Sequence, residues 1–256
     1  MNPSFRLTAL FGVCLLAPAL NAPLEAAEIT VLSSNGFREV LEDIVPKFEH
    51  ATGHKVLLTF NSSVGVKRAI DAGTEFDIAI GAPQEIESLA TAGKIKKETE
   101  VTLARVGIGV AIRAGAPKPD ISSTESFKQA MLNARSIMHN KEGASGRYVT
   151  ALFQRLGLAE QLKDRIVIKQ VPGPVAENIA KGEAEVGFQL ISEILPVAGA
   201  ELLGPLPPEL QTYILLMAGI GSMAKAEGPA GELLKFLALP GSAEVMKHKG
   251  LEPLPR

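Results

Sequence analysis

The chain has 256 residues, of which 46% are hydrophobic, and its 26 Lys and Arg nearly balance its 28 Asp and Glu. This length is enough for one large domain or two small ones. The balanced charge argues against nucleic-acid binding, which needs a clustered basic surface.

Residues 1–27 have the pattern of a secretory signal peptide. Arg6 supplies a positive start, residues 7–20 are apolar but too few to span a membrane, and small residues end the segment. We expect cleavage after Ala27. Cys14 is the single cysteine of the chain and lies inside the apolar run, where lipidation is not expected. The exported chain would then have no disulfides or thiolate ligands, and we expect it in the periplasm.

Strand-like and helix-like segments alternate from residue 28 onward. Short apolar runs predict strands, and apolar residues at helical spacing predict the helices between them. The strands are expected at 29–32, 56–60 and 77–80, and the helices at 37–50, 66–72 and 84–91. Such a strand–helix–strand series predicts a mainly parallel sheet with helices on its faces.

A long β-rich segment at 101–113 follows, and we interpret it as a strand that leaves one lobe and enters another. The second series has helices at 127–134, 145–156 and 175–181, and strands at 136–138, 166–170 and 186–191. The Pro-rich segment 204–210 predicts a loop. The apolar segment 213–220 could cross back, and closing helices are expected at 231–237 and 243–249.

This order predicts a two-lobed α/β fold with two hinge crossings. Each lobe is expected to have a mixed, mainly parallel sheet flanked by helices. Residues 28–105 and 214–256 would form lobe 1, and residues 106–213 would form lobe 2. In such sheets, ligands bind outside the carboxyl ends of the strands, which predicts a cleft between the lobes.

Three strand-to-helix loops carry small polar residues: Ser33, Ser34 and Asn35; Ser62 and Ser63; and Ser145 with Gly146. Helix N-termini have backbone N–H groups without intrahelical partners and a partial positive charge, so anions bind there. Hydroxyl groups add further donors. Any one loop alone is more simply read as an ordinary helix cap. Three of them together predict a shared anion pocket.

Cations lie early in the same helices, although the helix dipole disfavours them there. These are Arg38, Lys67 and Arg147. An anionic ligand would explain their placement, and the alternative is that each points into solvent. Arg147 is the strongest candidate, because it lies beside Tyr148 and a guanidinium can bind a carboxylate through two hydrogen bonds.

Several stretches of the chain resemble periplasmic molybdate-binding proteins, the type II solute-binding components of ABC importers. The resemblance covers essentially the whole exported chain. It is carried by the stretches "KFEHATGHKV", "FDIAI", "VGIGVAIRAGAPKPDIS", "GASGRY", "KGEAEVGFQLISEILP" and "LLKFLALPGSAEVMKHKGLEP". The stretches "FQLISEILP" and "LLGPLPPEL" are similar to a divergent branch that includes periplasmic aconitate isomerases.

The resemblance also implies ligand contacts. In the molybdate binders, a Ser in the first loop and a Ser in the second contact the oxyanion, and Ser63 matches the second. The first position falls on Gly36, and a later Tyr that caps the oxyanion is replaced by Leu190, beside Gln189. Ser145 falls near the third loop's contact. We therefore expect either a small oxyanion such as molybdate or a small polycarboxylate as the ligand, and a polycarboxylate would suit Arg147 and the hydroxyl-bearing loops.

Two functions therefore stay open. The first is a binding protein that closes on a small anion and presents it to the membrane subunits of an ABC importer. The second is an aconitate isomerase, which needs groups that remove and return a proton. His139, Glu142 and Glu193 are its candidate groups, although each also reads as an ordinary surface residue. We expect a monomer without cofactor, metal or nucleic acid, since the histidines lack metal-binding spacing.

Overall fold

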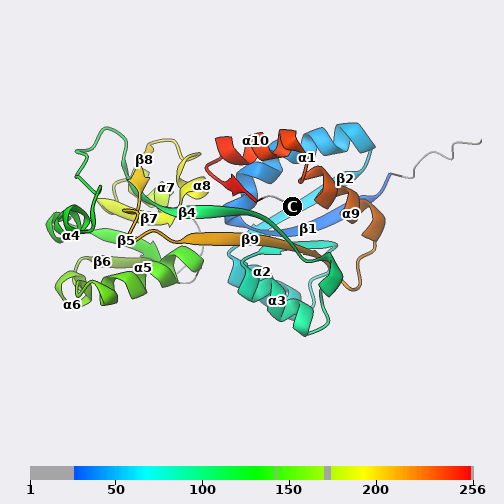
Figure 1. The fold of residues 1–256 in the computed structure, drawn as a ribbon, viewed down its shortest axis with the longest axis horizontal. Coiled ribbons are helices and arrows are strands. Elements are labelled where there is room, and N and C mark those ends of the chain that lie inside the picture. Colours follow the sequence, from blue (N-terminus) through cyan, green and yellow to red (C-terminus); the bar gives the residue numbers. More distant parts are fainter. Residues whose placement is uncertain (1–25, 142, 170–173, 255–256) are drawn as a thin grey trace, which may run out of the picture.

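The computed structural model describes residues 26–141, 143–169 and 174–254. It has two bodies joined by two long neighbouring strands, β4 (Val101–Arg113) and β9 (Tyr213–Ile220) (Figure 1). Within the described residues, no helix combines the length and the apolar character that crossing a membrane would require.

The first body is built on a sheet in the order β2-β1-β3-β9-β4. Its strands are β1 (Glu28–Ser34), β2 (Lys55–Asn61) and β3 (Ile78–Gly81), and β1 lies parallel to both β2 and β3. Strand β9 is antiparallel to both β3 and β4. The three parallel strands therefore end on the same edge of the sheet.

Helices cover both faces of this sheet (Figure 1). Side chains alternate between the faces because successive residues of a strand point to opposite sides. Ile29 and Val31 enter the larger core, and Leu32 enters a smaller one beneath the second face. The larger core is covered by α1 (Arg38–Thr52), α9 (Glu227–Phe236) and α10 (Pro240–His248), and the smaller by α2 (Ser63–Asp71) and α3 (Pro83–Thr91).

Strand β4 belongs to both bodies because its pairing changes along its length. Residues 101–107 pair with β9, and residues 108–113 pair with β7 (Val186–Leu190) and β8 (Ala200–Pro205). The second sheet continues in parallel from β7 to β5 (Ile137–Asn140) and β6 (Ile166–Lys169). The short β10 (Glu252–Pro253) also pairs with β4 in the first body.

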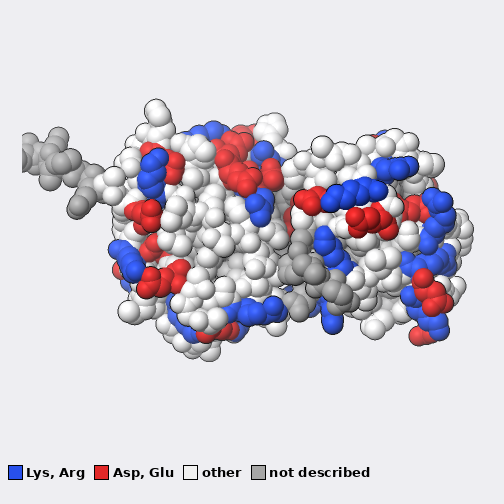
Figure 2. Space-filling view, turned by 180° about the vertical axis from the view of Figure 1, so that it is seen from behind, with Lys and Arg blue, Asp and Glu red and all other residues white. Residues whose placement is uncertain are grey.

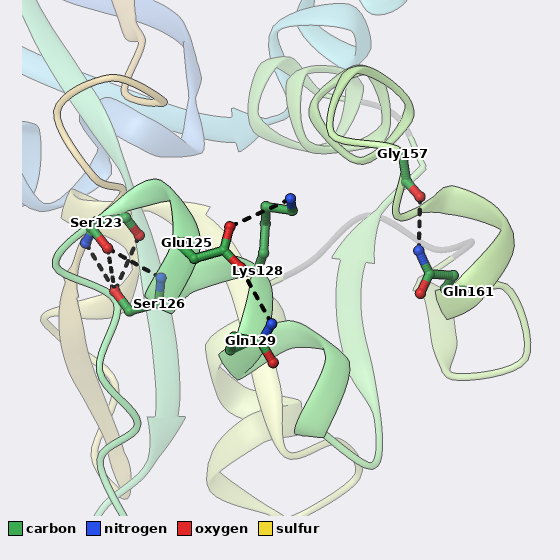
Figure 3. Close-up of polar contacts among 7 residues, drawn as sticks. All are labelled: Ser123, Glu125, Ser126, Lys128, Gln129, Gly157 and Gln161. Carbon is green, nitrogen blue, oxygen red and sulfur yellow. Dashed lines mark hydrogen bonds and ion pairs between the residues drawn. The ribbon is translucent and has the colours of Figure 1, made fainter.

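In the described part of the second body, five helices surround the sheet. Helix α4 begins at Thr124 because Ser123 and Ser126 form a reciprocal capping box, with Ser126 N–H donating to Ser123 Oγ over 3.1 Å (Figure 3). Figure 3 also shows Gln161 of α6 donating to the Gly157 carbonyl. The helices are α4 (Thr124–Asn133), α5 (Ala144–Arg155), α6 (Ala159–Leu162), α7 (Val175–Ala180) and α8 (Ile191–Ile194).

The observed elements follow the predicted order, with local differences. Ser33 and Ser34, expected in a loop, are the last residues of β1, and a short 3₁₀ turn, η1 (Asn35–Phe37), leads into α1. A second 3₁₀ turn, η2 (Lys97–Thr99), precedes β4. The expected loop 204–210 begins two residues late, because Gly204 and Pro205 still pair with β4. Pairing across the chain thus extends strands beyond their local signals.

Candidate functional site

A cavity of about 800 Å³ lies between the two bodies. One wall comes from the end of β2, from η1 and from the start of α1. The other comes from α7, the end of β7 and α8 with the turn that follows it. The lining residues are Asn35, Arg38, Glu39, Phe60, Asn61, Pro174, Glu177, Gln189, Ser192, Glu193, Pro196, Val197 and Ala198. This volume falls within the range of small-molecule sites.

Charged side chains of both signs lie near the junction of the two bodies, as the space-filling view from behind shows (Figure 2). Among the cavity residues, Arg38 is the cation and Glu39, Glu177 and Glu193 are the acids. Glu177 is exposed, so solvent and salt screen its charge. The cavity is therefore mixed in charge, with its guanidinium on the wall of the first body.

Arg38 is held in place by three neighbours. Its guanidinium lies 4.1 Å from the centre of the Phe60 ring, and its Nη2 donates to Asn35 Oδ1 over 3.4 Å. Nη1 pairs with Glu42 at 3.3 Å, one helical turn farther along α1. Stacking on an aromatic ring orients a guanidinium, and the N–H donors that Asn35 and Glu42 do not use remain for a ligand carboxylate. The start of α1 thus carries a positioned cation at the cavity wall.

Gln189 and Glu193 form the facing wall. Gln189 is 2% exposed, and its Oε1 accepts the N–H of Ala176, at the start of α7, over 3.0 Å. Its amide nitrogen is left to donate toward Glu193. Burial raises the pKa of the Glu193 carboxyl to about 7, despite hydrogen bonds from Leu190 and Gln189 and the positive charge of Arg38, which lower it. Such perturbed groups are common at functional sites.

The hydroxyls of the second loop are engaged but can still donate. Ser62 caps α2, since its Oγ accepts the N–H of Gly65 over 3.0 Å. Ser63 Oγ accepts the N–H of Ala82, just before α3, also over 3.0 Å. A hydroxyl that accepts one such bond keeps its proton for another acceptor. The capping interpretation therefore holds for Ser62 and does not exclude a ligand contact.

The two serines at the end of β1 are both buried. Ser33 donates to the Ser34 carbonyl over 3.1 Å. Ser34 Oγ has no hydrogen-bond partner among the described residues, although the side chain is only 4% exposed. An unpaired buried hydroxyl costs free energy, so its presence at a strand end favours a missing partner such as a ligand or water.

Arg147 reaches across to the first body. Its Nη2 lies 3.5 Å from Oε1 of Glu85, in the first turn of α3. The Glu85 carboxyl is 8% exposed, and its Oε2 has no hydrogen-bond partner among the described residues. Ser63 accepts a hydrogen bond from the backbone of Ala82, which lies three residues before Glu85. Arg147 and Ser63 therefore approach the same turn at the start of α3. An anion arriving there would compete with Glu85 for the guanidinium.

The rest of the third loop has structural roles. A Cβ added at Gly146 would overlap the backbone carbonyl of Asn140, so glycine is required for this close approach. Ser145 is buried in the first turn of α5. The Tyr148 hydroxyl donates to the Leu210 carbonyl over 2.6 Å and accepts from Arg155 over 3.2 Å. Its hydrogen bonds thus fix the segment before β9.

The three predicted acid–base candidates are not equivalent. Glu193 lines the cavity, whereas His139 does not. His139 is 2% exposed, its Nδ1 lies 2.9 Å from the Asn140 carbonyl, and burial lowers the pKa of its imidazole. Glu142 lies outside the described residues. Within the described ranges, His, Asp and Glu do not gather in groups of three that could hold a metal ion.

Gly36 and Leu190 contact each other across the two bodies. A Cβ at position 36 would lie 2.7 Å from Leu190 Cδ1. Ser192 Oγ also crosses the junction, donating to the Gly36 carbonyl over 2.9 Å. Gly36 and Leu190 are the two positions at which the resemblance implies a departure from the molybdate binders, and in this structure they form one packed contact. Leu190 fills the space that a serine side chain at position 36 would need.

We predict that Gly36→Ser lowers the free energy of unfolding by about 1–2 kcal/mol, because the added atoms overpack this contact. In a Leu190→Ala background, the same substitution should cost less than about 0.5 kcal/mol, because the space is then free. Urea denaturation of the four proteins measures this coupling. Equal costs in the two backgrounds would show that Leu190 is not the obstacle.

Of the predicted ligand residues, the cavity brings together Asn35 and Gln189, with Glu193 beside them. Ser63 and Arg147 meet at the start of α3, and the remaining predicted residues are not among those that line the cavity. Sequence reasoning missed Asn61 and Ser192, and it ranked Arg147 above Arg38, whereas Arg38 is the cation that lines the cavity. The residue that could have singled out Arg38 is Phe60, on which its guanidinium stacks. The two residues lie far apart in the sequence, and they come together only when β1 pairs with β2.

Comparisons with known proteins agree with this arrangement. Residues 29–252 match the family described as bacterial extracellular solute-binding protein. The chain is 30% identical over 262 residues to an aconitate isomerase from Pseudomonas sp, covering 100% of this chain and 99% of that protein. It is 28% identical to the molybdate-binding protein of Azotobacter vinelandii, covering 96% of each.

A solved structure, the periplasmic molybdate-binding protein of Azotobacter vinelandii, has the same fold. It superposes with a TM-score of 0.75 at 23% identity, covering 89% of this chain and 100% of that one. This confirms the predicted two-lobed α/β fold of the type II periplasmic binding proteins. The family model matches residues 29–252, and the chain therefore belongs to the bacterial extracellular solute-binding proteins.

Proposed function

We propose that this protein resides in the periplasm and binds a small polycarboxylate anion in the cavity between its two bodies. The observation that carries the proposal is Arg38, a guanidinium positioned on Phe60 and Asn35 at the wall of that cavity. A guanidinium binds a carboxylate with two parallel hydrogen bonds. Amide groups of Asn35, Asn61 and Gln189 offer further polar contacts around it.

The lining supports an organic anion over a tetrahedral oxyanion. Phe60, Pro174 and Val197 present apolar surface, for which an oxyanion such as molybdate has no counterpart. The resemblance implies that the molybdate binders use a hydroxyl at each of two positions that are Gly36 and Leu190 here, and neither of these residues has one. A carbon skeleton with several carboxylates suits both the guanidinium and the apolar walls. Molybdate remains a competing ligand in the test below.

Closure of the bodies on the ligand would then signal occupancy. Side chains already bridge the junction through Ser192 with Gly36 and Arg147 with Glu85. A ligand shifts such an equilibrium only by its difference in affinity for the open and closed forms. We propose that the closed form is presented to the membrane subunits of an ABC importer, as the family implies.

Binding is tested by isothermal titration of the purified protein with citrate, cis- and trans-aconitate, molybdate and tungstate. A polycarboxylate should bind, and Arg38→Ala should raise its Kd by about 10- to 100-fold, because charged hydrogen bonds are worth about 1.5–3 kcal/mol. Arg38→Lys should recover part of the lost affinity, since lysine keeps the positive charge but cannot make two parallel hydrogen bonds to one carboxylate.

The matched control is Arg135→Ala, which removes an exposed guanidinium outside the cavity and should leave the Kd unchanged. Binding of molybdate or tungstate alone would replace the polycarboxylate with an oxyanion as the ligand. Binding of none of these anions would reject the site.

A second candidate function is isomerisation of aconitate. Glu193 favours it, because a carboxyl with a pKa of about 7 lines the cavity and can both accept and donate a proton at neutral pH. The 30% identity with an aconitate isomerase, over the full length of both chains, supports the same candidate. Binding and turnover on one site are compatible, because the same cavity would hold the anion in both cases.

A further inference from the structure

We infer that Glu193 is a catalytic residue, which carries a proton between two carbon atoms of an unsaturated polycarboxylate bound in the cavity. This inference rests on the proposed function, since it needs a polycarboxylate held by Arg38. It assigns one carboxyl to both halves of the reaction. The assignment stands on the position of Glu193 on the wall opposite the first body's guanidinium.

A chain of hydrogen bonds orients the Glu193 carboxyl. The N–H of Ala176 fixes Oε1 of Gln189, so the amide of Gln189 must present its NH₂ group to Glu193. Gln189 is buried and its orientation is therefore set by α7 rather than by solvent. Gln189 is a positioning residue, because it acts on the substrate through Glu193.

The chemistry conserves protons and electrons. The Glu193 carboxylate removes a proton from the saturated carbon next to the double bond, so a C–H bond breaks and an O–H bond forms. The electron pair spreads over the three-carbon unit and its attached carboxylate, and the double bond moves. Glu193 then returns the proton to the carbon at the other end, so no oxidant, reductant or metal is required.

Arg38 would favour the charged intermediate. Removing a proton beside a carboxylate pushes negative charge onto that carboxylate, and a nearby guanidinium stabilises this charge. A carboxyl with a pKa of about 7 is also matched to the task, because both its forms are populated at neutral pH. His139 does not offer this, since it is buried and not among the residues that line the cavity.

Glu193 also has a structural explanation that the test must separate. It lies three residues after Leu190, which precedes α8, and its carboxyl interacts with the Leu190 backbone as in half of a capping box. Glu193→Gln keeps an oxygen that can accept this hydrogen bond and removes the ability to carry a proton. This substitution therefore tests the chemistry while preserving the cap.

The experiment follows cis- and trans-aconitate by NMR in H₂O and D₂O, with citrate affinity measured on the same proteins. Wild type should interconvert the two isomers. Glu193→Gln should lower turnover by about 100-fold or more while changing the citrate Kd by less than about threefold. Gln189→Leu should move the pH dependence of kcat/KM, because it removes a donor to Glu193. Glu209→Gln, an exposed acid outside the cavity, should leave turnover unchanged.

Three results would overturn the assignment. Undiminished turnover in Glu193→Gln would leave isomerisation intact and assign the proton to another group. Citrate binding by wild type without turnover of either isomer would refute catalysis and leave the proposed binding function standing. Failure of wild type to bind any polycarboxylate would remove the proposed function and this inference together.

Discussion

Replacing Asp77 with alanine is expected to lower the free energy of unfolding by about 3–5 kcal/mol, because three backbone donors lose their acceptor. Asp77 is 4% exposed. Its Oδ2 accepts the N–H of Thr30 in β1 over 2.8 Å. Its Oδ1 accepts the N–H groups of Lys225 and Ala226 over 2.7 and 2.9 Å, just before α9. One carboxylate thus joins the first strand to the last part of the chain.

The start of α9 gives this carboxylate a further favourable contact, since helix N-termini attract negative charge. Chemical denaturation followed by circular dichroism measures the loss. Asp43→Ala is the matched control, because Asp43 is a partly exposed partner of Lys47 and such ion pairs are worth about 1 kcal/mol or less. A loss below about 1 kcal/mol in Asp77→Ala would mean that water replaces the carboxylate without cost.

Asp77 also marks the limit of what sequence reasoning could reach. The stretch 77–80 predicts a strand from its apolar residues, and β3 lies at Ile78–Gly81. The role of Asp77 depends on partners 47, 148 and 149 residues away. No local spacing encodes such contacts, because they exist only after β1, β3 and α9 have been brought together.

The long strands were predictable for a physical reason. Residues 101–113 are rich in apolar and β-branched residues, residues 213–220 are an apolar run, and the structure has strands with these bounds. The absence of helical spacing and the enrichment in β-branched residues favour a strand over a helix in residues 101–113. The short β8 and β10 were not predicted, because the pairing with β4 that defines them lies far away in sequence.

The candidate site was predicted in type and only partly in detail. The three loops were expected to converge, and the contacts of Asn35, Ser63, Arg147 and Gln189 lie on strand ends or helix starts near the junction of the two bodies. Sequence alone could not show that Arg147 would already face a carboxylate, Glu85, from the other body. Helix periodicity indicates which face is buried but not which charged groups meet across a cleft.

Glu193→Gln is expected to stabilise the ligand-free protein in a pH-dependent way. The pKa of the Glu193 carboxyl is raised from 4.5 to about 7, so the fold disfavours its ionised form. Below pH 4.5 the carboxyl is protonated in both the folded and the unfolded chain, and the substitution should have little effect. Between pH 4.5 and 7 the unfolded chain ionises first, and wild-type stability is lost relative to Glu193→Gln as the pH rises.

Above pH 7 the full penalty remains, and the difference between the two proteins should reach about 3 kcal/mol, since a tenfold change in an acid constant is worth about 1.4 kcal/mol. Urea denaturation from pH 4.5 to 8.5 measures it. Subtracting the stability curve of the variant from that of wild type cancels the contributions of groups common to both proteins. One of these is His139, whose lowered pKa makes stability rise with pH rather than fall. Glu209→Gln should stay within about 0.5 kcal/mol of wild type throughout. A flat difference would mean that Glu193 ionises freely in the folded protein, and proton transfer at neutral pH would then need a different explanation.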